Sequence, residues 1–319
     1  MTPLRSAAHN LLEVNLGLRP GDVLAMVADP GKEWLEAAIE AACRARGVGF
    51  VSTVLESEGA YELPPYALAL LEDATAALIT TGRSYTHTDG VRAAAKRGVR
   101  VATNSRLNEE QLASGLLVDY RDVAADARRY AAFLDGASEV LVRSGGGAEL
   151  RFRIAGQRGL AETGLYTEPG MVGNLPAGEA ACGIDDGTGE GVLVVDGSWP
   201  GLGLLASPLT LTFEAGRVVR VEGERAAELE AVLEEKGPRS RELAELGLGM
   251  NPAFTVQGIT LLDEKVSGTV HVAVGNDVSF GGDNGVAYHA DGVVLQPELY
   301  LDGVRVDLPS GPAMVGAGS

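Results

Sequence analysis

The stretch DVLAMVADPGKEWLEAAIEAACRARGVGFVSTVLE, residues 22–56, decides the fold of the N-terminal part of this chain. Its apolar run at 22–29 is typical of a buried strand, and the Asp-Pro-Gly that ends the run predicts a turn into a helix. Helical spacing of apolar residues continues to Arg46, and Gly47 is a typical helix stop. A second apolar run at 48–56 predicts another strand. This order of elements indicates a βαβ unit with parallel strands.

The same alternation continues to residue 136. Further strands are expected at 75–82 and 99–104, with helical stretches near 63–72, 89–97, 108–116 and 119–134. The sequence therefore predicts an α/β domain over residues 1–136, with an open parallel sheet and helices on both faces. No GxGxxG follows the first strand and no GxxxxGKS/T occurs, so a nucleotide site is not indicated.

From residue 137 onward the pattern becomes β-rich. Strands are expected at 139–144, 148–155, 191–196, 209–214, 217–222, 269–275 and 298–307, with one helical stretch at 224–236. Gly145–Gly147 lies between two of these strands and predicts a hairpin turn. The domain boundary is expected near Gly136, so residues 137–319 form a C-terminal β-rich α+β domain.

The chain is strongly acidic, with a formal net charge of −18. Such a surface repels nucleic acid and anionic membranes, and neither is expected as a partner. Residues 1–137 carry 18 acidic and 14 basic residues, whereas residues 138–319 carry 26 and 12. Two interpretations of the acidic second half stay open. Its carboxylates form a solvated surface, or some of them converge on bound cations.

The sequence contains neither a membrane-spanning segment nor a cysteine motif. No apolar run reaches the roughly 18 residues needed to cross a membrane, and the N-terminus lacks the apolar core of a signal peptide. A cytoplasmic protein is therefore expected. Cys43 and Cys182 are far apart and form no CxxC motif. They are expected to be buried thiols rather than a disulfide or a thiolate zinc site.

Only four histidines occur, and two of them stand in a pattern suited to metal binding. His9 and His87 lie in polar stretches without suitably spaced acids and are expected at the surface. His271 follows GTV at the head of the apolar strand VHVAVG, and His289 is followed two places on by Asp291. On a strand, an H-x-D pair points both side chains to one face, where they can bind zinc, cobalt, manganese or ferrous iron. A structural histidine is the alternative.

Two glutamates stand among small and apolar residues. Glu179 lies in GNLPAGEAA, residues 173–181, where little regular structure is expected. Glu245 lies in ELAELGLGMNP, residues 242–252, at the expected end of a short helix. Burying a carboxylate is costly unless a cation meets it, and few lysines or arginines are nearby in sequence. A metal ion would supply that cation.

These segments, taken in order, carry a family resemblance. NLPAGE, AELGLGMNP, DEKVSGTVHVAVG and YHAD resemble successive motifs of the aminopeptidase T and aminopeptidase S metallopeptidases, as does the opening LLEVNLGLRPGDVLAMVAD. The resemblance implies a metal-dependent aminopeptidase that removes N-terminal residues from peptides with a free N-terminus. It further implies two bound zinc, cobalt or manganese ions, a metal-binding catalytic C-terminal domain and a homodimer.

The resemblance also implies the residues of the site. It carries over five metal ligands: Glu179, Glu245, His271, His289 and Asp291. The DEK motif adds Glu264 as a general base or orienting group and Lys265 as the stabiliser of an oxyanion. A solvated charge run is the alternative for these last two residues.

One departure from the family keeps other functions open. The family has a tyrosine a few residues after the first histidine, where this chain has Val278. The same fold resembles that of dihydroxypyridine ring-cleaving dioxygenases, in which two histidines and one carboxylate hold a single ferrous ion. His271, His289 and Asp291 would suffice for that set. A binding protein without catalysis is the third interpretation.

Overall fold

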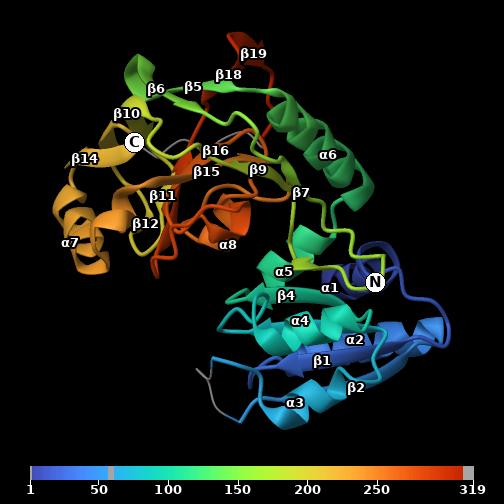
Figure 1. The fold of residues 1–319 in the computed structure, drawn as a ribbon. Helices are drawn as coiled ribbons and strands as arrows, with labels where there is room; N and C mark the ends of the chain where they lie inside the picture. The colour runs from blue at the N-terminus through green and yellow to red at the C-terminus, as the bar shows by residue number, and fades with distance from the viewer. Residues whose placement is uncertain (1, 57–60, 312–319) are drawn as a thin grey trace. The chain divides into compact units, whose positions relative to one another are not determined.

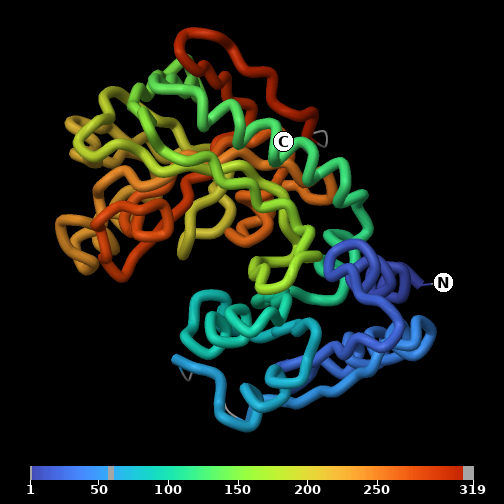
Figure 2. Tube along the Cα trace, turned by 45° about the vertical axis from the view of Figure 1, so that its right-hand side comes forward, coloured from blue at the N-terminus to red at the C-terminus, as the bar shows by residue number. Residues whose placement is uncertain are grey.

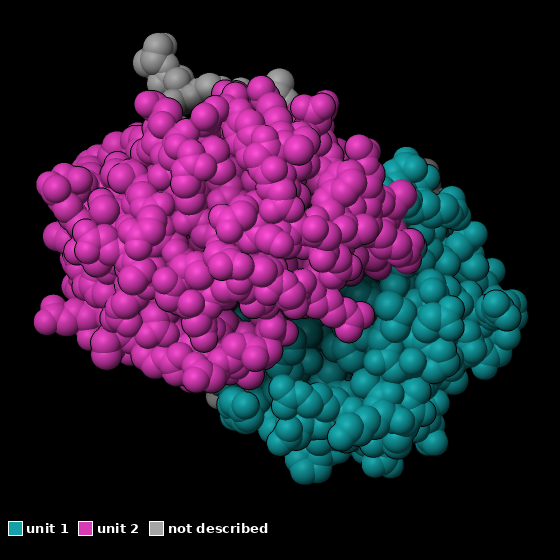
Figure 3. Space-filling view, turned by 45° about the horizontal axis from the view of Figure 1, so that its top comes forward, with its two compact units in different colours: residues 1–123, 164–177 teal, residues 124–163, 178–319 magenta. Residues whose placement is uncertain are grey.

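The computed structural model describes residues 2–56 and 61–311 and divides into two compact units. Unit 1 comprises residues 1–123 and 164–177, and unit 2 comprises residues 124–163 and 178–319. Figure 3 colours the two units separately. The chain passes from unit 1 to unit 2, returns for residues 164–177, and then completes unit 2, a path that can be followed in Figure 2. The single domain boundary that the sequence analysis expects near Gly136 stays a prediction.

Unit 1 is built on a five-stranded sheet in the order β2-β1-β3-β4-β8, and every pair in it is parallel. Its strands are β1 (Val23–Ala28), β2 (Gly49–Val54), β3 (Ala76–Thr81), β4 (Arg100–Ser105) and β8 (Val172–Asn174). The four strands predicted from the sequence are confirmed. The fifth strand, β8, comes from the returning segment and was not predicted.

Helices connect and cover this sheet (Figure 1). They are α1 (Pro3–Asn10), which a π-helical turn extends to Asn15, α2 (Glu33–Arg46), α3 (Pro65–Leu70), α4 (Asp89–Lys96) and α5 (Glu109–Leu116). From β1 the chain first adds β2 on one side and then adds β3 and β4 on the other side. Because crossovers are right-handed, α2 lies on one face and α3 and α4 on the other, as predicted. Gly47 ends α2 with φ of 69°, which is the left-handed region that glycine adopts most readily.

Unit 2 contains two larger antiparallel sheets. The seven-stranded sheet has the order β14-β13-β10-β6-β5-β18-β19, and the five-stranded sheet has the order β17-β16-β15-β9-β7. The first contains β5 (Glu139–Ser144), β6 (Ala148–Arg153), β10 (Glu190–Val195), β13 (Leu209–Glu214), β14 (Arg217–Glu222), β18 (Glu298–Leu301) and β19 (Val304–Val306). The second contains β7 (Leu160–Glu162), β9 (Glu179–Gly183), β15 (Leu243–Gly249), β16 (Val270–Gly275) and β17 (His289–Val294). A short pair, β11 (Ser198–Trp199) and β12 (Gly203–Leu204), stands apart.

One hydrophobic core joins the two sheets of unit 2. It includes Phe152 and Leu211 from the seven-stranded sheet and Leu246 and Val272 from the five-stranded sheet. The unit's helices are α7 (Ala226–Lys236), the short α8 (Thr260–Asp263) and α6 (Tyr120–Gly136), which begins in unit 1. Gly145–Gly147 joins β5 to β6 as the predicted hairpin turn. The mixed fold, a parallel sheet followed by antiparallel sheets, is the fold class expected from the sequence.

Three local predictions for this unit were wrong. Glu245 lies inside strand β15 rather than at the end of a helix, because β9 and β16 both pair with β15. Glu179 is the first residue of β9 rather than part of an irregular segment. The strand expected at 298–307 is a hairpin of β18 and β19, which turns at Asp302 with φ of 48°. The first two depend on pairing with distant strands, which local patterns do not contain. The third is a local turn that the sequence analysis missed.

In the part of the chain that the structure describes, no helix is long and apolar enough to span a membrane.

Candidate metal centre

One face of the five-stranded sheet in unit 2 carries the charged residues. Side chains alternate between the faces of a strand, so Glu245, Gly247 and Gly249 of β15 lie on one face, while Leu246 and Leu248 enter the core. The same alternation holds in the neighbouring strands. Glu179 on β9, His271 on β16 and both His289 and Asp291 on β17 share the face of Glu245.

The positions between these residues on the same face are small. Gly247 pairs with His271, and a Cβ atom at Gly247 would lie 1.9 Å from the Nε2 atom of that histidine. His271 is 1% exposed, so its imidazole lies over the glycine backbone and is enclosed on its other sides. The glycine is required here because any side chain would occupy the place of the imidazole.

The donor atoms of this face lie close together. The Nε2 atom of His289 lies 3.0 Å from Glu245 Oε2 and 3.2 Å from Asp291 Oδ1. The Nε2 atom of His271 lies 3.5 Å from Glu245 Oε1 and 3.6 Å from Glu179 Oε2. Ligand atoms at 2.1 Å around a tetrahedral ion are about 3.4 Å apart. Donor atoms of Glu245, His271 and Asp291 lie within 4.8 Å of one another, so these buried residues could share one ion.

A buried lysine adjoins the donor atoms. Lys265 is 1% exposed, and its ammonium lies 2.6 Å from Glu162 Oε2, 2.9 Å from Glu179 Oε1 and 2.9 Å from Glu264 Oε1. This lysine therefore has three carboxylate partners. Glu179 lies between it and His271, with one oxygen toward each.

Charge in this cluster is unbalanced without a further cation. Five carboxylates, those of Glu162, Glu179, Glu245, Glu264 and Asp291, meet one ammonium group and two imidazoles. Burying unpaired carboxylates costs several kcal/mol each. The donor set of imidazole nitrogen and carboxylate oxygen suits a divalent transition metal. The residues present therefore fit a metal cofactor.

The pKa values of the carboxyl groups reflect this excess of negative charge. Burial raises the pKa of Glu179 to about 8 against the opposing effect of Lys265, and it raises that of Glu264 to about 7. Burial opposes the ionisation of Glu245 and Asp291 as well. Hydrogen bonds from both histidines outweigh it at Glu245 and lower its pKa, and His289 lowers the pKa of Asp291 to about 2.

Burial acts on the pKa values of the histidines in the opposite direction, because it disfavours their charged, protonated form. Burial alone would lower the pKa of His271, but the hydrogen bond to Glu245 and the charge of Glu179 raise it to about 9. Burial is likewise outweighed at His289, where Asp291 raises the pKa to about 12. Without a metal, protons on the imidazoles therefore supply part of the missing positive charge.

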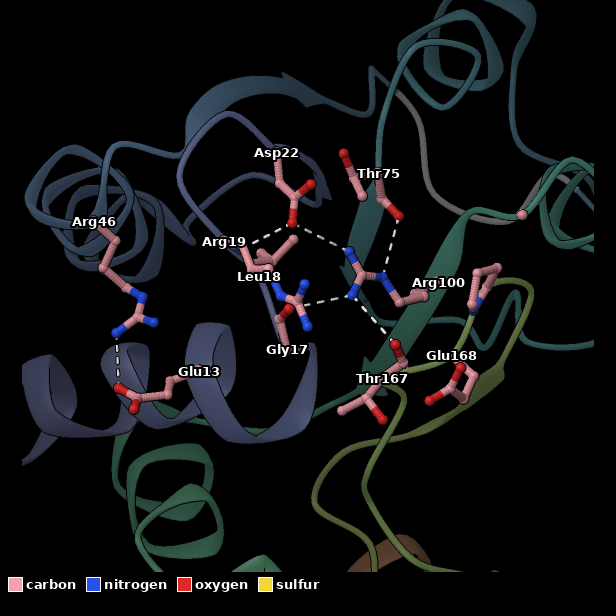
Figure 4. Close-up of a pocket in the computed structure, with 12 residues that line it drawn as sticks. Glu13, Gly17, Leu18, Arg19, Asp22, Arg46, Thr75, Arg100, Thr167 and Glu168 are labelled. Atoms are coloured by element: carbon pink, nitrogen blue, oxygen red, sulfur yellow. Dashed lines mark hydrogen bonds and ion pairs between the residues drawn. The ribbon is translucent and has the colours of Figure 1, made fainter.

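A separate cavity of about 630 Å³ lies in unit 1, near the amino ends of the parallel strands (Figure 4). Arg46 pairs with Glu13 at 2.7 Å, and Arg100 lies 3.5 Å from Asp22 and donates to the carbonyl of Leu16 at 2.7 Å. These arginines tie loop segments of unit 1 together. None of the described residues that line the cavity is a histidine or a cysteine, and we assign it no chemistry.

Comparison with known proteins decides the family. The sequence profile of NicX, described as 2,5-dihydroxypyridine 5,6-dioxygenase, matches residues 36–308, which is most of the chain. The chain belongs to the NicX family. The family first expected, that of aminopeptidases T and S, is less well supported, and the NicX match agrees with the alternative that the sequence offered. A comparison with curated protein sequences finds no match.

Solved structures share the fold of this NicX-family chain. The 2,5-dihydroxypyridine dioxygenase of Pseudomonas putida KT2440 aligns with a TM-score of 0.79 and 18% identity, over 98% of this chain and 99% of that chain. Wild-type AmpT of Thermus thermophilus aligns with a TM-score of 0.67 and 16% identity, over 95% and 96%. At these identities the likeness is one of fold.

The structure brings together all seven residues that the sequence named for the site. These are Glu179, Glu245, Glu264, Lys265, His271, His289 and Asp291. Sequence reasoning missed Glu162, which lies on β7 and pairs in register with Glu179. Its signal was present in LAETG, where a glutamate again stands among small residues.

Proposed function

We propose that this chain is a ring-cleaving dioxygenase that uses one ferrous ion and acts on a dihydroxylated pyridine or a closely related ring. The observation that carries the proposal is the NicX family match over residues 36–308, together with two histidines and an aspartate on one face of a buried sheet. We assign His271, His289 and Asp291 as the iron ligands. Ferrous iron would relay electrons from the ring to dioxygen, which does not react readily with the ring alone.

The remaining residues of the cluster would prepare the site for a ring hydroxyl. We propose that Glu264, with its pKa raised to about 7 by burial, accepts a proton from that hydroxyl near neutral pH. Lys265, enclosed by three carboxylates, would hold Glu179 and Glu264 in place rather than contact the substrate. Glu245 accepts hydrogen bonds from both imidazoles in the metal-free state. Its oxygens lie 3.5 and 3.0 Å from the Nε2 atoms of His271 and His289, so once those nitrogens bind iron it would balance the charge beside the ion.

Oxygen uptake tests this proposal. Protein loaded anaerobically with ferrous iron should consume about one dioxygen per 2,5-dihydroxypyridine added, as the ring absorbance disappears. His289→Ala should lower the rate at least 100-fold, because a nitrogen ligand is lost. His9→Ala, in helix α1 of unit 1, is the matched control and should leave the rate unchanged. Iron-loaded protein that consumes no oxygen with any dihydroxypyridine would overturn the assignment.

One observation favours a second candidate, a two-metal aminopeptidase. Glu245 presents Oε1 to His271 and Oε2 to His289, so its carboxylate lies between the two imidazoles, as a bridging ligand would. Metal content separates the candidates. About one iron per chain supports the dioxygenase, whereas two zinc, cobalt or manganese ions support the peptidase. The peptidase should also cleave leucine anilide but not its N-acetylated form, because acetylation removes the amine that the metal anchors.

A further inference from the structure

The two imidazoles of the metal centre are held by different means. His271 is enclosed by packing, but the side chain of His289 is 32% exposed and is packed on only part of its surface. The Nδ1 atom of His289 lies 2.7 Å from the main-chain carbonyl of Asn276. A carbonyl only accepts hydrogen bonds, so Nδ1 carries a proton and Nε2 is the nitrogen left to bind a metal. The position of this carbonyl therefore sets the direction of the ligand.

That carbonyl belongs to the loop of residues 276–288, which joins β16 to β17. Both ends of the loop are tied at Asn276. Its N–H donates to the carbonyl of Tyr288 at 2.7 Å, and its side-chain amide donates to the carbonyl of Val286 at 3.0 Å. Most residues of the loop are exposed, so packing alone does not fix it.

Two residues of this loop are buried, Asp277 at 5% exposure and Asn284 at 0%. The Nδ2 atom of Asn284 donates to the carbonyl of Gly275 at 2.7 Å and to that of Arg239 at 2.8 Å. Its N–H donates to Asp277 Oδ1 at 2.8 Å, and its Oδ1 atom accepts from the N–H of Val286 at 3.2 Å. The side chain of Asn284 thus connects the end of β16, the segment before β15 and the second half of the loop, and its main-chain N–H adds the link to the first half.

We propose that Asn284 is a positioning residue for the metal centre. It holds the loop so that the carbonyl of Asn276 fixes both the protonated nitrogen and the direction of His289. The inference rests on the proposed metal centre but not on which reaction that centre serves. Groups that hydrogen-bond directly to a ligating histidine change metal affinity about 10- to 100-fold when they are removed, and Asn284 acts through such a group, the carbonyl of Asn276.

Metal affinity of two variants tests the inference. In the full-length protein, Asn284→Ala and Asn284→Asp should each weaken zinc binding, measured by chelator competition, about 10- to 100-fold. On charge alone, the added carboxylate of Asn284→Asp would tighten the binding of a cation, so weaker binding in that variant reports lost positioning. Asn104→Ala, at a buried asparagine in unit 1, is the matched control and should bind zinc as the native protein does.

Nitrogen-15 NMR of the zinc-loaded protein gives a second measurement, which does not depend on metal affinity. The Nδ1 proton of His289 should be protected from exchange with water, and Asn284→Ala should speed its exchange at least tenfold while the signals of His271 stay in place. Fast exchange in the native protein, or equal zinc affinity in folded variants, overturns the inference and leaves the metal centre standing. Native protein that binds no metal at all overturns the metal centre and this inference with it.

Discussion

Gly247 determines, at the scale of single residues, where His271 can lie. A Cβ atom there would be 1.9 Å from the imidazole Nε2, and the ring is enclosed and cannot move aside. We expect Gly247→Ala to weaken metal binding about 100-fold and to cost about 1–3 kcal/mol of stability from overpacking. Isothermal titration with zinc and the melting temperature of the metal-free protein measure the two effects.

Gly136→Ala is the control for that substitution. Gly136 is the last residue of α6, and a Cβ atom there would meet nothing within 4 Å. Its metal affinity should equal that of the native protein. Native affinity in Gly247→Ala as well would show that the imidazole of His271 does not bind the metal where the structure places it.

The two cysteines should be inert in the native protein. Burial raises the pKa of Cys43 to about 11 and that of Cys182 to about 12, and neither is exposed. At pH 8 nearly all of both groups are thiols, and the thiolate is the reactive form. A thiol reagent should therefore label two cysteines in denaturant and none within minutes in the folded protein. Rapid labelling at pH 8 would contradict this expectation.

Glu179, Glu245 and the pair of His289 and Asp291 could be singled out from their own segments because a buried charge needs a partner, whereas Glu264 and Lys265 were named only through the family resemblance. Glutamates among small residues and an H-x-D pair need cations, and this physical requirement is local to each segment. The sequence did not predict which of these residues form ion pairs with one another. The contact between Glu162 and Lys265 joins residues about a hundred positions apart, and nothing near Glu162 indicates it.

Strand β15 shows, at the scale of elements, where local patterns misled. Its segment ELGLG, residues 245–249, alternates charged or small residues with leucine, which is a period of two and favours a strand. A helix was expected instead, because glutamate and leucine favour helices and glycine favours turns. Pairing with β9 and β16 outweighs these preferences. The parallel strands were easier, because their continuous apolar runs match the burial on both faces that parallel sheets have.

Helix α5 begins with a capping box whose contribution can be measured. The side chain of Asn108 accepts from the N–H of Gln111 at 3.0 Å, and the side chain of Gln111 accepts from the N–H of Asn108 at 3.1 Å. We expect Asn108→Ala to lower the free energy of unfolding by about 1 kcal/mol, because an N–H group of the first turn loses its partner. Asn108→Asp keeps the acceptor and should lose much less, as denaturant unfolding of both variants would show.

Stability of the whole molecule should depend on metal, and more so at high pH. In the metal-free protein, the pKa is raised to about 8 at Glu179 and to about 9 at His271. A raised pKa contributes stability below the ordinary value of the group, and that contribution is lost as pH rises through the raised value. Metal affinity itself rises with pH, because the ligands must lose protons.

Chelator should therefore lower the melting temperature, and by more at pH 9 than at pH 6.5. Differential scanning calorimetry with and without chelator at the two pH values measures this difference. The same experiment in Glu179→Gln should show a smaller dependence on pH, since one of the titrating groups is gone. A chelator effect that is absent, or that shrinks as pH rises, would count against a metal centre in this cluster.

The arrangement of the whole chain was only partly predictable. Two regions of different character, α/β and β-rich, were expected and found. The return of residues 164–177 to unit 1 was not expected, because β8 is only three residues long and owes its place to pairing with β4. Such a short strand carries little pattern of its own.

Because β8 comes late in the sequence, the parallel sheet of unit 1 can be completed only late in synthesis. The ribosome makes β4, residues 100–105, well before β8, residues 172–174, so the nascent sheet has an open edge while the first strands of unit 2 emerge. Unpaired parallel edges attract other strands, including those of neighbouring nascent chains. A fragment that stops at residue 136 would keep that edge open permanently. A gene fragment that encodes a complete parallel sheet must therefore extend through β8, beyond the α/β pattern that ends near residue 136.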